Sequence, residues 1–260
     1  MNKKSQVTMY VILGIVILIV IGIIFFLRAN IINSVFKQES QKIKEVPPQV
    51  QVINDFVQDC VQSVSEDALY VIGYHGGYFI TPDPSTVDKI PYYFINNKSI
   101  IPTKERIEVE ISKYINQELK FCTNNFSNFS EFKINQGNVN TKTSIKGNGT
   151  FIDVEYPLNI KKGEINYQLK DFSTILPIRL ELIYSVSKTI IDKQVEDPNN
   201  ICLSCLLDLE LKNNLYIDMI SYFGDTAVFT IIDKNSILGE EHYGSEVEEY
   251  YNFRFALKYD

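Results

Sequence analysis

The chain has 260 residues and a formal net charge of −7. Its composition, 45% hydrophobic and 22% charged, is that of an ordinary folded protein and not of a disordered chain. Residues 1–28 contain three basic residues and no acidic one, so the remainder carries 22 basic against 32 acidic residues. This excess of acidic residues repels a phosphate backbone, so nucleic-acid binding is not expected.

Residues 7–27 form an uncharged apolar stretch, with Lys3 and Lys4 before it and Arg28 after it. A helix of this length is about 31 Å long, which matches the hydrocarbon core of a bilayer. A buried core helix, the alternative, would be shorter and would show a polar face. The sequence therefore predicts a basic cytoplasmic head at 1–6 and a transmembrane helix at 7–27.

A short basic head followed by an apolar run has the layout of a signal sequence. This layout predicts a single-pass protein of the cell membrane, with a cytoplasmic N-terminus and an extracytoplasmic C-terminal domain. A cleaved secretory signal is the alternative, but its apolar region would be about 7–15 residues long and would precede a small-x-small site. The expected partners are the lipid bilayer and, through the transmembrane helix, further copies of the chain or other envelope proteins.

The residues Lys3-Lys4-Ser5-Gln6-Val7-Thr8 lead directly into the apolar stretch and resemble the class III signal of archaeal type IV pilins and archaellins. In that family a membrane peptidase cuts before the helix, so the resemblance implies a cut between Ser5 and Gln6. Ser5 stands where glycine or alanine is usual, and Tyr10 where many pilins have glutamate. The wider layout is similar to that of uncharacterised single-pass archaeal surface proteins. A simple signal anchor explains the same topology without processing.

Helical patterns continue after the membrane. Residues 28–48 are expected to extend the transmembrane helix as a stalk that ends at Pro47-Pro48, because adjacent prolines interrupt a helix. Apolar residues at helical spacing predict a second helix at 50–72, with Gly73 as its C-cap. A third helix is predicted to begin after Thr103, its N-cap.

Strand patterns occupy much of the remaining sequence. The segments 74–80 and 91–101 read as two short strands or a hairpin. Antiparallel strands joined by glycine-containing turns are predicted at 139–146, 150–160 and 164–172. A fourth helix is predicted at 177–195, followed by a short helical or irregular segment. Three further strands are predicted at 215–222, 227–233 and 250–259.

The order of one helix followed by three strands occurs twice. Hairpin-connected strands favour an α+β fold with helices packed on antiparallel sheets. We therefore expect the transmembrane helix and stalk to be followed by an extracytoplasmic domain with a first α+β unit at 49–175 and a second at 176–260.

Four cysteines in an exported domain predict disulfides. Cys60 and Cys122 lie on apolar faces of the second and third predicted helices, so a bridge between them would join these helices. Two buried free thiols are the alternative. Cys202 and Cys205 have the spacing of a redox pair but lack the surroundings of a thioredoxin-like site, and no second CxxC completes a zinc site. A local structural disulfide is expected there.

The sequence contains no recognised catalytic signature, and its two histidines limit acid–base and metal chemistry. His75-Gly76-Gly77 is similar to a hydrolase oxyanion loop, but no Gly-x-Ser-x-Gly motif accompanies it, so a glycine turn is expected. The acidic run 240–249 matches no calcium loop, so a solvated loop is expected rather than a cation site. The sequence therefore predicts no catalytic residue, metal or cofactor.

Asn97, Asn125, Asn128 and Asn148 each begin an Asn-x-Ser/Thr sequon, which predicts glycosylation of an exported domain. The whole pattern predicts a membrane-anchored surface or envelope protein with a structural or binding role, as a pilin-like subunit or an accessory subunit of a secretion or pilus machine. The alternative is a membrane-tethered enzyme, either a hydrolase or a thiol oxidoreductase.

Overall fold

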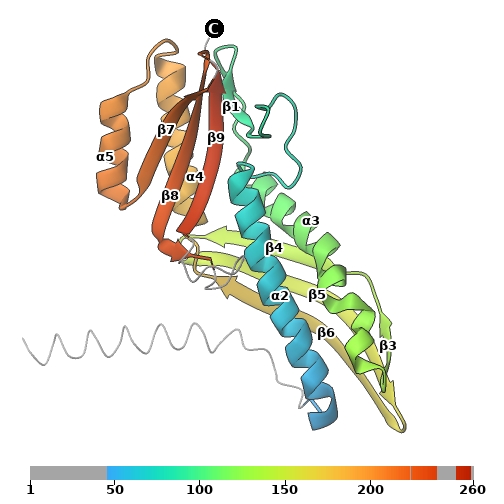
Figure 1. The fold of residues 1–260 in the computed structure, drawn as a ribbon. Helices are drawn as coiled ribbons and strands as arrows, with labels where there is room; N and C mark the ends of the chain where they lie inside the picture. Colours follow the sequence, from blue (N-terminus) through green and yellow to red (C-terminus); the bar gives the residue numbers. More distant parts are fainter. Residues whose placement is uncertain (1–45, 223, 239–249, 259–260) are drawn as a thin grey trace, which may run out of the picture. The chain divides into compact units, whose positions relative to one another are not determined.

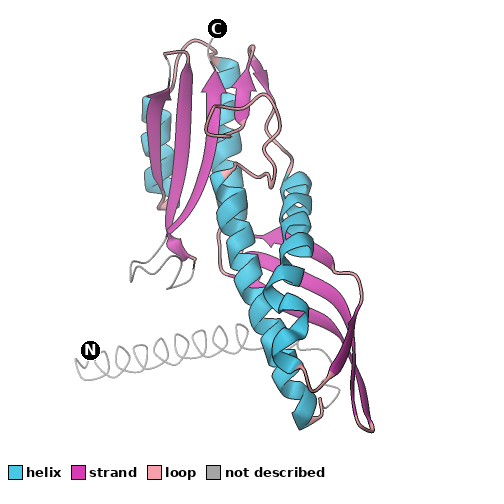
Figure 2. Ribbon diagram, turned by 45° about the vertical axis from the view of Figure 1, so that its right-hand side comes forward, coloured by secondary structure: helices cyan, strands magenta, loops and turns pink. Residues whose placement is uncertain are grey.

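A computed structural model describes residues 46–222, 224–238 and 250–258 (Figures 1 and 2). The predicted cytoplasmic head, transmembrane helix and most of the stalk lie outside these residues. No helix in the described part of the chain is long and apolar enough to cross a membrane. Residues Gln49–Asp260 belong to one compact unit, whose helices and sheets confirm the predicted α+β class.

Helix α2 (Pro48–Tyr74) confirms the second predicted helix and extends it by two residues at each end. Its C-cap is not Gly73, because the chain leaves the helix only at Gly76 and Gly77, whose φ angles are +52° and +86°. The Gly77 N–H donates to the Ile72 carbonyl at 2.7 Å and closes the last turn. The predicted glycine turn is confirmed, but it also ends the helix.

The segment that follows α2 forms a loop rather than the predicted strand. Helix α3 (Lys104–Thr123) holds this loop in place. The Phe79 N–H donates to the Glu110 carboxylate at 3.2 Å, and the Phe79 ring packs edge-on against Tyr114 with 5.1 Å between centroids. Phe79 therefore packs on a helix instead of joining a sheet, and Ile80 beside it is exposed. At the start of α3, Thr103 accepts a hydrogen bond from the Arg106 N–H, which confirms the predicted N-cap.

Four antiparallel strands form a sheet beside α2 and α3 (Figure 2). They are β3 (Lys133–Gln136), β4 (Asn140–Lys146), β5 (Gly149–Lys162) and β6 (Ile165–Leu176). The last three confirm the predicted run of three strands, whereas β3 was not predicted. Strand β5 is central, because β6 pairs along one edge while β4 and then β3 pair along the other.

Side chains of the two helices cover the outer edges of this sheet. On the β4 edge, the Ile145 N–H donates to the Glu108 carboxylate at 2.8 Å and the Thr143 N–H donates to the Ser112 hydroxyl at 3.1 Å. On the β6 edge, the Gln58 amide donates to the backbone carbonyl of Ser173 at 2.8 Å. Edges occupied in this way are protected at these positions from pairing with another chain.

A second, five-stranded sheet has the order β2-β1-β9-β8-β7. Its strands are β2 (Lys98–Ser99), β1 (Tyr92–Ile95), β9 (Tyr250–Lys258), β8 (Thr226–Ile237) and β7 (Tyr216–Tyr222). Helices α4 (Leu180–Glu196) and α5 (Leu203–Asn213) lie against one side of it (Figure 1). The predicted β segment at 91–101 is found as the short hairpin β1–β2, and the three last strands predicted from the sequence are confirmed. Because β1 pairs in parallel with β9, this sheet joins distant parts of the sequence, and the division after residue 175 stays a prediction.

A buried ion pair connects the start of α4 to β8. The Arg179 Nε donates to Asp233 Oδ2 at 2.8 Å, and the same guanidinium donates to the carbonyls of Asn213 and Asn214 at the end of α5. Burial raises the pKa of the Asp233 carboxyl, but hydrogen bonds from Arg179 and Ser236 outweigh burial and hold this pKa below its usual value. Asp233 is therefore charged in the folded protein at neutral pH.

Candidate functional site

The four cysteines form the two predicted disulfides. Cys60–Cys122 joins α2 to α3, with Cα atoms 5.7 Å apart. Cys202–Cys205 closes the first turn of α5, with Cα atoms 5.2 Å apart. The first bridge links two helices that are far apart in the sequence, whereas the second is local.

The surroundings of the second bridge contain little room for a substrate. Cys202 is exposed at the start of α5, and its Sγ lies 3.6 Å from the Ser204 hydroxyl. A cavity beside the bridge, between α4 and α5, is lined in part by Ile190 and Leu206 and has a volume of about 10 Å³. Such a space holds roughly one water molecule. The geometry is that of a local structural bridge.

All four predicted glycosylation residues are exposed. Asn97 lies in the turn between β1 and β2, and Asn148 in the turn between β4 and β5. Asn125 and Asn128 lie in the short 3-10 helix η1 (Asn124–Phe129) that follows α3. Exposure leaves each side-chain amide accessible to a modifying enzyme, and the modification itself stays a prediction.

Other residues singled out in the sequence fall outside a recognisable site. Ser5, Gln6 and the acidic run 240–249 lie outside the described residues. No group of three or more His, Cys, Asp or Glu side chains that could hold a metal ion occurs in the part of the chain that the structure describes. His75 lies in the glycine turn after α2, next to a pocket that the sequence did not indicate.

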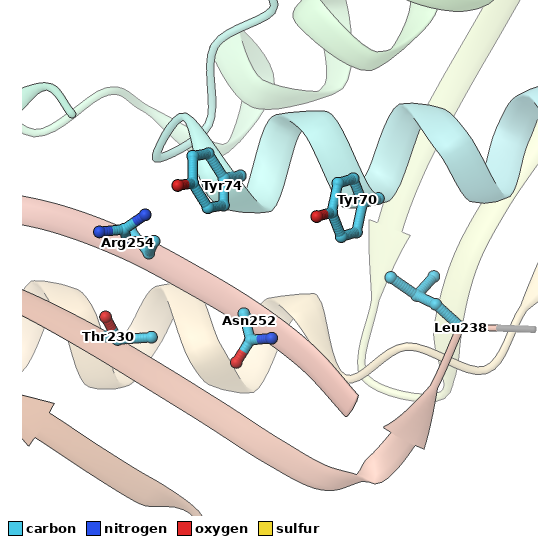
Figure 3. A pocket seen from close by; sticks show the side chains of 6 residues that line it. All are labelled: Tyr70, Tyr74, Thr230, Leu238, Asn252 and Arg254. Atoms are coloured by element: carbon cyan, nitrogen blue, oxygen red, sulfur yellow. The ribbon is translucent and has the colours of Figure 1, made fainter. Parts of the chain in front are cut away.

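This pocket lies between the end of α2 and strands β8 and β9 and has a volume of about 270 Å³ (Figure 3). The described residues that line it are Tyr70 and Tyr74 of α2, Thr230 of β8 with Leu238 just after it, and Asn252 and Arg254 of β9. The two tyrosine rings lie side by side on one wall, and the polar side chains of the strands form the other (Figure 3).

Two glycines bring the end of α2 against the edge of β9. A Cβ atom on Gly73 would lie 2.3 Å from the carbonyl oxygen of Asn252, and one on Gly76 would lie 2.4 Å from that of Arg254. Only a residue without a side chain permits such an approach. Tyr70 and Tyr74 are one helical turn apart, so their rings project from the same side of α2 over the strands.

The alternation of β9 supplies the polar wall. Three aromatic residues of this strand are fully buried: Tyr251, Phe253 and Phe255. Asn252 and Arg254, which alternate with them, are partly exposed on the opposite face of the sheet. Thr230 is the direct cross-strand partner of Arg254, so its hydroxyl reaches the same pocket.

Among the described residues that line the pocket, Arg254 alone carries a permanent charge, which is positive. The Arg254 guanidinium lies 4.4 Å from the centroid of the Tyr74 ring, which is a cation–π contact, and forms no ion pair with any of the described residues. Burial lowers the pKa of His75; the charge of Arg254 acts in the same direction, against a hydrogen bond with the Phe79 backbone. His75 is therefore neutral at neutral pH and adds no second charge.

Sequence reasoning missed the pocket because its lining residues come from segments separated by more than 150 positions. The available signal was the pair Asn252 and Arg254, two polar residues alternating with aromatic ones in a strand. No family model, no curated protein and no solved structure matches the chain. The chemistry of the pocket and of the N-terminal sequence therefore guides the functional proposal.

Proposed function

We propose that the chain is a membrane-anchored surface or envelope protein whose extracytoplasmic domain has a structural or binding role. The observation that carries this proposal is the uncharged apolar stretch at 7–27, which has the length of a membrane-spanning helix and follows two lysines. In this proposal the stretch continues as a helical stalk that stops before α2 begins at Pro48, and the domain lies outside the cytoplasm.

Two features of the described domain support an extracytoplasmic location. All four cysteines are paired in disulfides, which form and persist in oxidising compartments. All four sequon asparagines are exposed, as glycosylation outside the cytoplasm requires. The pocket beside Arg254 supports a binding role, because it is concave, partly aromatic and carries several polar groups.

The experiment for the anchor compares full-length variants by fractionation of cells that produce them. The unaltered chain is expected in membranes that survive an alkaline carbonate wash and to be released by detergent. Ile17→Arg with Leu18→Arg places two charges at the middle of the stretch, each costing about 3 kcal/mol on insertion. The matched control is Ile17→Val with Leu18→Ile. Recovery of the unaltered chain in the soluble fraction would refute the anchor.

The pilin-like reading is a narrower proposal about the same segment. Processing between Ser5 and Gln6 would leave the apolar helix on the mature protein, where it could assemble with other subunits. Intact mass spectrometry of protein purified from its native membranes tests this. Loss of residues 1–5 supports processing by a class III signal peptidase, whereas an N-terminus at Met1 or Asn2 excludes it.

A further inference from the structure

We propose that the pocket between α2 and β9 binds a carboxylate-bearing sugar, of which a hexuronic acid is the simplest representative. The inference rests on the binding role proposed above and names its ligand class. It does not depend on the membrane anchor, because every group that it uses belongs to the described domain.

The charge of Arg254 in the pocket favours an anion. The chain as a whole is acidic, with a net charge of −7. Arg254 is partly buried and has no acidic partner among the described residues. The planar guanidinium donates two parallel hydrogen bonds to a carboxylate, and the partly desolvated position strengthens this interaction.

The remaining lining residues favour a sugar over a simple anion. Tyr70 and Tyr74 line the pocket, and Tyr74 stays 40% exposed although Arg254 lies over its ring. Exposed aromatic surface of this kind can pack against the C–H groups of a pyranose ring. Hydroxyl and amide groups of both walls can donate to and accept from sugar hydroxyls. A volume of about 270 Å³ is close to the lower end of small-molecule sites, so it suits a single ring.

A purely structural role for Arg254 is the competing explanation. Its guanidinium stacks on Tyr74, the last residue of α2, where the carbonyl end of the helix attracts a positive charge. That role predicts a loss of stability when Arg254 is replaced, but it predicts no selectivity among ligands. Arg254→Lys separates the two, since lysine keeps the charge near the helix end and loses the fork geometry.

The test measures binding to the full-length protein in detergent by isothermal titration calorimetry. The probe is sodium glucuronate, compared with glucose, sodium glutamate and inorganic phosphate at the same ionic strength. We expect glucuronate to bind at least tenfold more tightly than each of the other three. Arg254→Gln and Arg254→Lys are both expected to weaken glucuronate binding at least tenfold.

Lys258→Gln is the matched control. Lys258 lies on the same face of β9 and pairs with Asp225 at 3.3 Å, outside the pocket, so this variant should bind glucuronate within twofold of the unaltered chain. Thr230→Val keeps Arg254 and removes one hydroxyl, so it should weaken binding several-fold even if the Arg254 variants fail to fold.

Three results would overturn the proposal. Equal binding of glucose and glucuronate would show that the carboxylate is not recognised. Equal binding of glutamate or phosphate would show a general anion site. Unchanged glucuronate binding in both Arg254→Lys and Thr230→Val would place the sugar elsewhere. None of these results would alter the fractionation experiment, so failure here is distinguishable from failure of the proposed anchor.

Discussion

Removing each disulfide in turn should destabilise the domain by very different amounts. The variants are Cys60→Ala with Cys122→Ala and, separately, Cys202→Ala with Cys205→Ala. A disulfide stabilises the folded state mainly by restricting the unfolded chain, and the effect grows with the number of residues between the cysteines. The two bridges differ in this number by a factor of about twenty, because their sequence separations are 62 and 3.

The chain-entropy relation converts these separations into free energies. It gives about 4 kcal/mol for Cys60–Cys122 and about 1.5 kcal/mol for Cys202–Cys205. Packing increases the difference, because Cys60 is buried in the core whereas Cys202 is exposed. We therefore expect the first pair of substitutions to cost at least 2 kcal/mol more than the second.

The assay is equilibrium unfolding in urea of the full-length protein in detergent. Tyrosine fluorescence serves as the probe, since the chain has 16 tyrosines and no tryptophan. Both variants should fold, and the midpoint should fall much further for the helix-joining bridge. Equal destabilisation by the two pairs, or a larger loss from the local bridge, would refute the reasoning from loop length.

Three other substitutions test single contacts by urea unfolding. Asp233→Asn should lower the free energy of unfolding by about 3 kcal/mol at pH 7, because it leaves Arg179 without a buried charged partner. The pKa of Asp233 is lowered in the folded protein. The difference in stability from the unaltered chain should therefore persist above pH 3.8 and vanish only below it. The unaltered chain should lose stability as pH falls below 6.5, because His75 binds a proton more readily in the unfolded chain than in the folded protein. His75→Gln should make this loss of stability smaller. Identical pH profiles of the two proteins would contradict this. Gly73→Ala should destabilise the domain by about 2 kcal/mol, because the alanine Cβ would clash with the Asn252 carbonyl oxygen. Alanine normally favours a helix, so the expected sign is the opposite of its helix propensity. A gain in stability would show that α2 does not approach β9 this closely.

The sequence predicted the elements whose patterns are local. Apolar residues recur at helical spacing in α2 and α3, and glycine-containing turns separate β4, β5 and β6, so these elements were placed to within a few residues. Strand β3 was missed because its four residues, Lys133–Gln136, are mostly polar and pair only at the end of a longer strand. Such a strand depends on its neighbour rather than on its own composition.

One segment was wrongly predicted as a strand because two glycines turn its backbone and Phe79 has a tertiary partner. Residues 74–80 contain tyrosine, phenylalanine and isoleucine, which favour a strand. However, Gly76 and Gly77 adopt positive φ angles, which end helix α2 and prevent the extended backbone of a strand, and Phe79 packs on α3. The positive φ of a glycine cannot be read from its neighbours in sequence, so the C-cap was placed at Gly73 instead.

The disulfides could be predicted from local sequence patterns, whereas the pocket could not. Cys60 and Cys122 lie on the apolar faces of recognisable helices, so their pairing followed from amphipathicity. The pocket, in contrast, depends on the approach of α2 to β9, which two glycines allow and which no local pattern indicates. Arg254 became a candidate only when the structure showed it stacked on Tyr74 without an acidic partner among the described residues.

The side of the membrane on which the domain folds is measured most directly by adding a protease to intact cells that produce the full-length chain. Antibodies against the C-terminal residues then report whether the domain survives, and detergent-lysed cells confirm that the protease can digest it. We expect the C-terminal signal to disappear from intact cells while a cytoplasmic marker stays whole. A domain that survives in intact cells and is digested only after lysis would contradict an extracytoplasmic location.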